Sequence, residues 1–151
     1  MPTFQHQGQR LSYSEFGSGE RTVVLLHGLL LNRRMHEPLA EALAGRGNRV
    51  VTLDLLGHGD SDRPADPWRY SMTAFGEQTI ALLDHLGVDQ AVVLGTSLGA
   101  NTTLEAAVLA PERLRGMVVE MPVLDGALIA CGVAFMPPLL ALRYAQPAAL
   151  A

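Results

Sequence analysis

The sequence predicts an α/β protein with a doubly wound, mostly parallel sheet that begins with an antiparallel hairpin. Polar and apolar residues alternate through residues 3–7 and 10–16, on either side of Gly8, which indicates two strands joined by a short turn. Further along, nearly unbroken apolar runs indicate strands buried on both faces; they span residues 23–26, 49–53, 91–94 and 117–119. Helical patterns between them span residues 35–45, 73–86 and 98–110. Strands that alternate with helices favour right-handed crossovers and a parallel sheet.

Length and composition restrict the class of protein. A chain of 151 residues, 48% of them hydrophobic, is long enough to bury the core of one globular domain. Its formal net charge of -4 provides no excess of positive charge for phosphates, so we expect no nucleic-acid partner. The single cysteine, Cys131, cannot form an intrachain disulfide, which excludes a small disulfide-rich scaffold.

Neither end of the sequence predicts a membrane protein. Residues 1–10 are polar and lack the apolar centre of a signal peptide, so we expect a cytoplasmic location. Residues 127–142 form the only membrane candidate, but they contain Pro137 and Pro138 and are shorter than the roughly 20 apolar residues of a spanning helix. We therefore expect no membrane partner, and we interpret this stretch as buried or as part of a lid.

A serine lies at the point where the third parallel strand is expected to meet a helix. The sequence Gly95-Thr96-Ser97-Leu98-Gly99 matches the pattern G-x-S-x-G, and it follows a buried strand and opens a helix. This context is that of a nucleophile elbow, a strained turn that exposes a serine hydroxyl above the sheet. The alternative is a glycine-rich turn of some other doubly wound fold in which Ser97 caps the helix.

Three motifs together resemble those of the α/β-hydrolase superfamily. They are His27-Gly28-Leu29-Leu30, the segment from Asp54 to Ser61 that reads D-L-L-G-H-G-D-S, and the serine motif around Ser97. Each follows a predicted strand, and the three occur in the family's order. The resemblance extends from about residue 4 to residue 120, and it implies an α/β-hydrolase fold that lacks its last strands.

The resemblance assigns roles to residues of these motifs. It implies that the backbone amides of Leu29 and Leu98 form the oxyanion hole, and that His27 orders its loop rather than acting as a base. The segment around Asp54, His58 and Ser61 is implied to be a structural turn. The alternative for that segment is that His58 and Asp60 act as a base and its orienting acid.

The same resemblance implies a catalytic triad in the order serine, acid, histidine, with the histidine after the last strand. The sequence has six strand candidates and then ends, so we expect a fragment from which the catalytic base is absent. Glu120 and Asp125 are the candidates for the acid. Glu120 is the better placed of the two, although an ordinary polar strand terminus is the favoured interpretation of this residue.

The other histidines are not expected to replace the missing base. His6 lies in the predicted hairpin, and we expect His36 and His85 to be surface residues of helices. We expect residues 1–125 to form the N-terminal part of the hydrolase core and residues 126–151 to begin a lid. The strand at residues 117–119 would then present an unpaired edge, through which the chain could self-associate.

The predicted function is that of a serine hydrolase acting on an ester, thioester, lactone or similar small acyl substrate, without metal or cofactor, and inactive as this 151-residue chain. A serine at position 97 argues against the epoxide hydrolases and haloalkane dehalogenases of the same fold, which by resemblance use a carboxylate there. One alternative is a non-catalytic binding or interaction module. Another is a cofactor-free, haloperoxidase-like activity.

Overall fold

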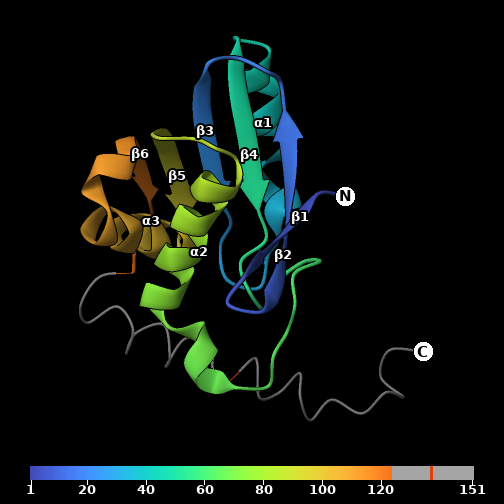
Figure 1. The fold of residues 1–151 in the computed structure, drawn as a ribbon, viewed down its shortest axis with the longest axis vertical. Coiled ribbons are helices and arrows are strands. Elements are labelled where there is room, and N and C mark those ends of the chain that lie inside the picture. Colours follow the sequence, from blue (N-terminus) through green and yellow to red (C-terminus); the bar gives the residue numbers. More distant parts are fainter. Residues whose placement is uncertain (124–136, 138–151) are drawn as a thin grey trace.

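The computed structural model describes residues 1–123 and residue 137, and within this part the chain forms one mixed sheet covered by helices (Figure 1). The sheet has six strands in the order β1-β2-β4-β3-β5-β6. Their bounds are Thr3–His6 for β1, Gln9–Phe16 for β2, Arg21–Leu26 for β3, Asn48–Leu53 for β4, Ala91–Thr96 for β5 and Leu114–Glu120 for β6. The α/β class and the N-terminal hairpin predicted from the sequence are confirmed.

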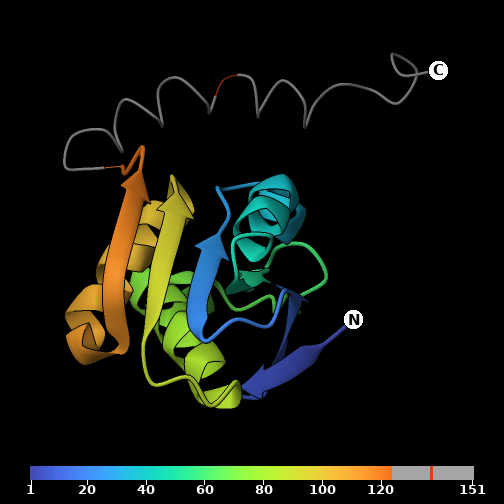
Figure 2. The same cartoon turned by 90° about the horizontal axis from the view of Figure 1, so that it is seen from above.

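The pairing of the strands divides the sheet into two parts. β1 and β2 pair antiparallel, and β2 continues antiparallel to β4, with Tyr13 opposite Leu53. From β4 onward every pairing is parallel. Figure 2 shows β3, β5 and β6 side by side and pointing the same way. Their carboxyl ends therefore lie at one edge of the sheet, where open α/β sheets place their binding sites.

Helices cover both faces of the sheet, as a doubly wound fold requires. Their bounds are Glu37–Ala44 for α1, Met72–His85 for α2 and Leu98–Leu109 for α3. Alternate residues of one strand enter different cores: Leu25 packs with Ala40 of α1, whereas Val24 and Leu26 join the core that contains Leu82 of α2. In Figure 1, α2 and α3 lie on the near face of the sheet and α1 lies behind it.

The boundaries differ from the sequence prediction in two places. The helix expected from residue 35 begins as a short 3₁₀ helix, Arg33–His36, and the α-helix starts only at Glu37, with proline in its first turn. Strand β6 begins at Leu114 rather than at residue 117, because backbone pairing with β5 extends to positions that the apolar pattern does not mark.

Several predictions concern residues outside the part that the structure describes. They are the acid candidate Asp125, the cysteine Cys131 and nearly all of the lid predicted over residues 126–151. Within the described part, no helix is long and apolar enough to span a membrane. There, β6 pairs with β5 alone, and self-association through its other side remains a prediction.

Candidate active site

Ser97 occupies a sharp turn between β5 and α3. Its φ of 54° and ψ of -109° lie in a region that residues with a side chain rarely adopt. It stands at the N-cap position of α3, yet its side chain makes no capping hydrogen bond. The alternative in which Ser97 serves as a capping residue is therefore wrong, and its hydroxyl is left unused by the helix.

Two glycines allow the turn to form. A Cβ atom on Gly95 would lie 2.0 Å from the carbonyl oxygen of Gly99, and one on Gly99 would lie 2.2 Å from the carbonyl oxygen of Leu26. Backbone atoms cannot move aside as the end of a flexible side chain can. The spacing G-x-S-x-G is thus required by the close approach of α3 to β5 and β3.

The end of β6 is attached to this turn by hydrogen bonds. The amide of Ser97 donates to the carbonyl oxygen of Glu120 at 2.9 Å, and the hydroxyl of Thr96 donates to the Glu120 carboxylate at 2.7 Å. Just beyond, the side-chain amide of Asn101 both donates to Val123 O and accepts from Val123 N, at 2.8 and 2.9 Å. Glu120 therefore lies beside Ser97, and its exposed side chain remains open to solvent.

The loop after β3 lies against the serine turn. Gly28 is buried, and a Cβ atom on it would be 3.8 Å from the Cβ atom of Ser97. Leu30 has a φ of 63°, and Leu31 N donates to Gly28 O at 3.2 Å, which closes a tight turn around Leu29. No hydrogen bond joins the amide of Leu29 or of Leu98 to an acceptor among residues 1–123. Each amide is therefore without an acceptor in this part of the chain.

His27 is buried beneath this loop, and both ring nitrogens are engaged. Nε2 accepts from the amide of Leu55 at 3.2 Å, so Nδ1 carries the proton and donates to Gly28 O at 2.8 Å. Burial lowers the pKa of His27, although its bond to Gly28 O opposes this effect. A neutral ring with both nitrogens occupied connects the loops after β3 and β4 and leaves no lone pair for a general base.

The loop after β4 is built around the buried carboxylate of Asp54. Asp54 accepts from the backbone amides of Arg33 and Asp60, at 2.6 and 2.8 Å, and forms an ion pair with the Arg33 guanidinium. The Ser61 hydroxyl donates to the Asp54 carbonyl oxygen at 2.7 Å. A Cβ atom on Gly59 would meet the Asp54 carboxylate at 2.0 Å. This segment has the contacts of a structural turn.

Arg33 connects this turn to the loop after β3 and is itself buried, with 2% of its side chain exposed. It also forms an ion pair with Asp60 at 2.9 Å. Burial opposes the charge of Arg33, but the guanidinium donates hydrogen bonds to the carboxylates of Asp60 and Asp54, and their negative charges and these bonds outweigh burial and raise its pKa. Asp60 is thus paired with Arg33, which argues against the alternative in which it orients His58.

Among residues 1–123, no histidine is hydrogen-bonded to Ser97. His58 is engaged at Nδ1 by Leu56 O, at 3.1 Å, and its ring lies 4.8 Å from that of His27 between centroids. His36 is buried and bonded through Nε2 to Leu26 O, so the expectation of a surface residue was wrong: the 3₁₀ turn directs its ring inward. His85 is exposed as expected and bonds to the Tyr13 hydroxyl.

Residues 1–123 and 137 contain no group of side chains that could hold a metal ion.

Sequence reasoning missed two residues near this site. Arg33 stands in an Arg-Arg pair that is typical of a solvated surface, and nothing in the local pattern marks it as buried. Asn101 lies in the middle of a predicted helix, where a polar residue usually faces water. In each case the partner is more than 20 residues away in the chain, so local sequence gives no signal.

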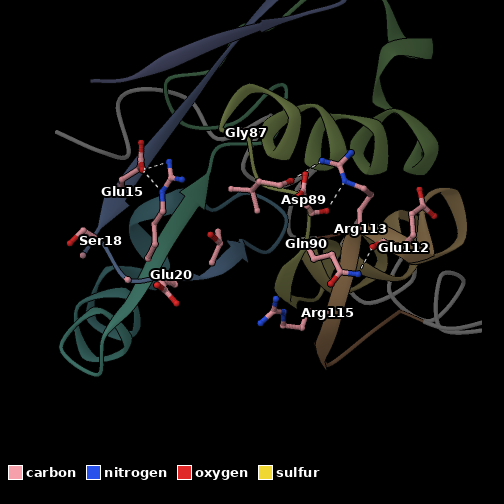
Figure 3. A pocket seen from close by; sticks show the side chains of 14 residues that line it. Glu15, Ser18, Glu20, Gly87, Asp89, Gln90, Glu112, Arg113 and Arg115 are labelled. Atoms are coloured by element: carbon pink, nitrogen blue, oxygen red, sulfur yellow. Dashed lines mark hydrogen bonds and ion pairs between the residues drawn. The ribbon is translucent and has the colours of Figure 1, made fainter.

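A polar cavity of 1030 Å³ lies at the opposite end of the sheet (Figure 3). Most of its lining comes from the segments that precede β3, β5 and β6 and from the starts of β3 and β6, and Glu15 of β2 and Arg49 of β4 also line it. Three of its charged residues already have partners, since Arg49 pairs with Glu15, which also lines the cavity, at 2.8 Å, and Arg113 pairs with Asp84 at 2.6 Å. Because none of its lining residues belongs to the turn around Ser97, the cavity is separate from the candidate active site.

The fold and the strained serine between β5 and α3 define a protein of the α/β-hydrolase type. A family model described as alpha/beta hydrolase fold matches residues 21–148. This chain belongs to that family.

Proteins named for different activities share this similarity. The bifunctional epoxide hydrolase 2 of Mus musculus is 32% identical over 131 residues, which cover 87% of this chain and 22% of that protein. A 2-hydroxymuconate semialdehyde hydrolase of Pseudomonas putida is 42% identical over 71 residues, 47% of this chain and 25% of that protein. Among solved structures, Est816, described as an N-acyl homoserine lactone degrading enzyme, has a TM-score of 0.77 and 26% identity, and the match covers 89% of this chain and 53% of that one. The chain thus spans between a fifth and about half of these relatives.

Proposed function

We propose that this chain carries the nucleophile and the oxyanion hole of a serine hydrolase that acts on small acyl substrates such as esters, thioesters or lactones. The observation that carries this proposal is the backbone of Ser97, held at a φ of 54° with its hydroxyl free of the helix cap. Strain of this kind costs on the order of 1–3 kcal/mol and persists where the surrounding structure enforces it, often at catalytic sites.

The geometry supports a specific division of roles. Ser97 Oγ attacks the acyl carbon and loses its proton to a base, and the carbonyl oxygen becomes an oxyanion. The amides of Leu29 and Leu98 donate to that oxyanion, each contributing about 3 kcal/mol of transition-state stabilisation by comparison with known donors. The leaving group then departs with a proton, and water releases the acyl group from Ser97 in a second attack.

The proposal also requires a proton acceptor that the described residues do not place beside Ser97. His27 is excluded by its two occupied nitrogens, and no other histidine bonds to the serine. We assign the base to a group other than the five histidines of this chain, all of which lie among residues 1–123. Glu120 is our candidate for the acid that orients this base, because its carboxylate lies beside the serine turn and one oxygen is fixed by Thr96.

The relatives favour hydrolysis in general, and the residue at the elbow narrows the chemistry. One relative is named an epoxide hydrolase, another a semialdehyde hydrolase, and one structural neighbour a lactone-degrading enzyme. By family resemblance, epoxide hydrolases use a carboxylate at the position of Ser97. A serine there supports transfer of an acyl group rather than opening of an epoxide.

Chemical rescue with imidazole tests the proposal on the 151-residue chain itself. A fluorophosphonate probe should modify Ser97, found by mass spectrometry of the peptide, and added imidazole should accelerate the modification by serving as an external base. Ser97→Ala should remove the label, and Thr102→Ser, on the buried side of α3, is a control that should retain it. If the probe leaves Ser97 unmodified while the chain is folded and imidazole is present, the proposal is wrong.

A second candidate function is that of a non-catalytic binding module. The observation that favours it is the absence of any hydrogen bond between Ser97 and a histidine among residues 1–123. The same experiment separates the two functions, because a module that does not use the serine gains no reactivity at Ser97 from imidazole.

A further inference from the structure

A cavity of 430 Å³ lies between the loop after β3, which carries Leu29, and the segment that follows β4. Leu30 and Leu31 form part of its wall, and Arg33, Arg34, Asp60 and Arg63 supply its charges. All these segments follow the carboxyl ends of parallel strands, as the serine turn does. The cavity therefore lies at the same edge of the sheet as Ser97.

The charges of this cavity are not balanced among the described residues. Arg33 is neutralised by Asp54 and Asp60. Arg34 and Arg63 are exposed and have no carboxylate within ion-pair distance in residues 1–123, although Arg63 donates to Gly59 O. Two guanidinium groups therefore remain free to bind an anion, in a chain whose formal net charge is -4.

Asp60 has a lowered pKa, which indicates a positive electrostatic potential in the cavity. Its hydrogen bond with Arg33 is the main cause of a pKa below the ordinary value of 3.8, and the charges of Arg34 and Arg10 act in the same direction. Arg34 is thus close enough to favour a negative charge in the cavity. A carboxylate brought by a ligand would experience the same field.

The wall next to these arginines is apolar. Leu30 and Leu31 expose 73% and 48% of their surface, and the loop that carries them continues from Gly28, where an added Cβ atom would lie 3.8 Å from the Cβ atom of Ser97. Exposed leucines beside guanidinium groups suit an organic anion, whose carbon chain lies on the leucines while its charged end pairs with arginine. An inorganic anion would make no use of the leucines.

We propose that Arg34 and Arg63 bind a carboxylate carried by the acyl substrate, at the end remote from the bond that Ser97 attacks. The inference rests on the proposed serine chemistry. It narrows the substrate class to esters or lactones of dicarboxylic or similarly anionic acids. Arg34 and Arg63 are specificity residues in this assignment, and Leu30 and Leu31 hold the connecting carbon chain.

Binding can be measured without turnover in the Ser97→Ala chain. Monoethyl succinate, an ester with one free carboxylate, is titrated at constant ionic strength while NMR follows the side-chain Nε–H signals of the arginines. We expect saturable shifts at Arg34 and Arg63. The double variant Arg34→Gln/Arg63→Gln should bind about tenfold more weakly, the loss expected for charge-assisted hydrogen bonds.

The control is a second double variant, Arg21→Gln/Arg46→Gln, which removes the same charge from exposed positions outside the cavity. It should bind within about twofold of the parent. Equal weakening in both double variants would mean a general charge effect and would overturn the proposal, as would a lack of saturable shifts. Binding of inorganic phosphate but not of monoethyl succinate, or equal binding of uncharged diethyl succinate, would also overturn it. Because Ser97 is absent throughout, these outcomes are independent of whether Ser97 is reactive.

Discussion

The backbone amide of Ser97 donates to the carbonyl oxygen of Glu120, with 2.9 Å between nitrogen and oxygen. This bond continues the parallel pairing of β5 with β6 by one residue past the end of β5, so the strained turn is anchored to a neighbouring strand. The serine is therefore held by the sheet on one side and by two close glycine contacts on the other. Rigid support of this kind preserves the orientation of the hydroxyl.

Substitution of Gly99 tests the steric requirement of the turn. Gly99→Ala places a Cβ atom 2.2 Å from the carbonyl oxygen of Leu26, so we expect a loss of about 3 kcal/mol in the free energy of unfolding. Urea denaturation measures the loss. Gly116→Ala is the matched control, because a Cβ atom there meets nothing within 4 Å. Equal losses in the two variants would contradict the steric argument.

The ion pair of Arg33 with Asp54 is expected to be essential for stability. Arg33→Gln leaves the Asp54 carboxylate buried without its positive partner, which should cost about 3 kcal/mol in denaturant unfolding. The neighbouring Arg34→Gln removes the same charge from an exposed side chain and should change stability by less than about 0.5 kcal/mol. A similar cost for both variants would show that burial of Arg33 has no energetic consequence.

The buried neutral ring of His27 should make stability depend on pH. Its pKa is lowered in the folded protein, so the unfolded chain binds a proton more readily below the ordinary value of 6.5. The contribution of His27 is fully present above pH 6.5 and declines as the pH falls toward the lowered pKa. Urea titrations at a series of pH values should show this decline, and His27→Gln should flatten it. If the free energy of unfolding of the variant falls with pH as steeply as that of the parent, groups other than His27 cause the pH dependence.

The two hydrogen bonds of Asn101 should hold the segment after β6. Asn101→Ala removes both bonds to Val123, with an expected cost of about 1–2 kcal/mol and faster hydrogen exchange at the Val123 amide. Asn101→Asp keeps an acceptor for that amide but loses the donor, so it should protect Val123 better than alanine does. Equal exchange in the parent and the alanine variant would show that other contacts fix this segment.

Much of the fold could be predicted from the sequence because the signals are local. The unbroken apolar runs of β3, β4 and β5 indicate that both faces of these strands are buried. The glycines around Ser97 indicate that a helix closely approaches a strand there. The order of the three motifs was sufficient to indicate the family, which the family model over residues 21–148 confirms. The roles of Ser97, Leu29, Leu98 and Glu120 stay predictions that the geometry is consistent with.

The sequence by itself determined the class of fold, the hairpin and the serine turn, since apolar periodicity and glycine spacing act over a few residues. Only the tertiary structure decided which charges are buried. Arg33 and its neighbour Arg34 look alike in the sequence, yet one is enclosed between Asp54 and Asp60 while the other faces solvent. The difference arises because the carboxylates that neutralise Arg33 come from the loop after β4, more than 20 residues away, and only folding brings them together.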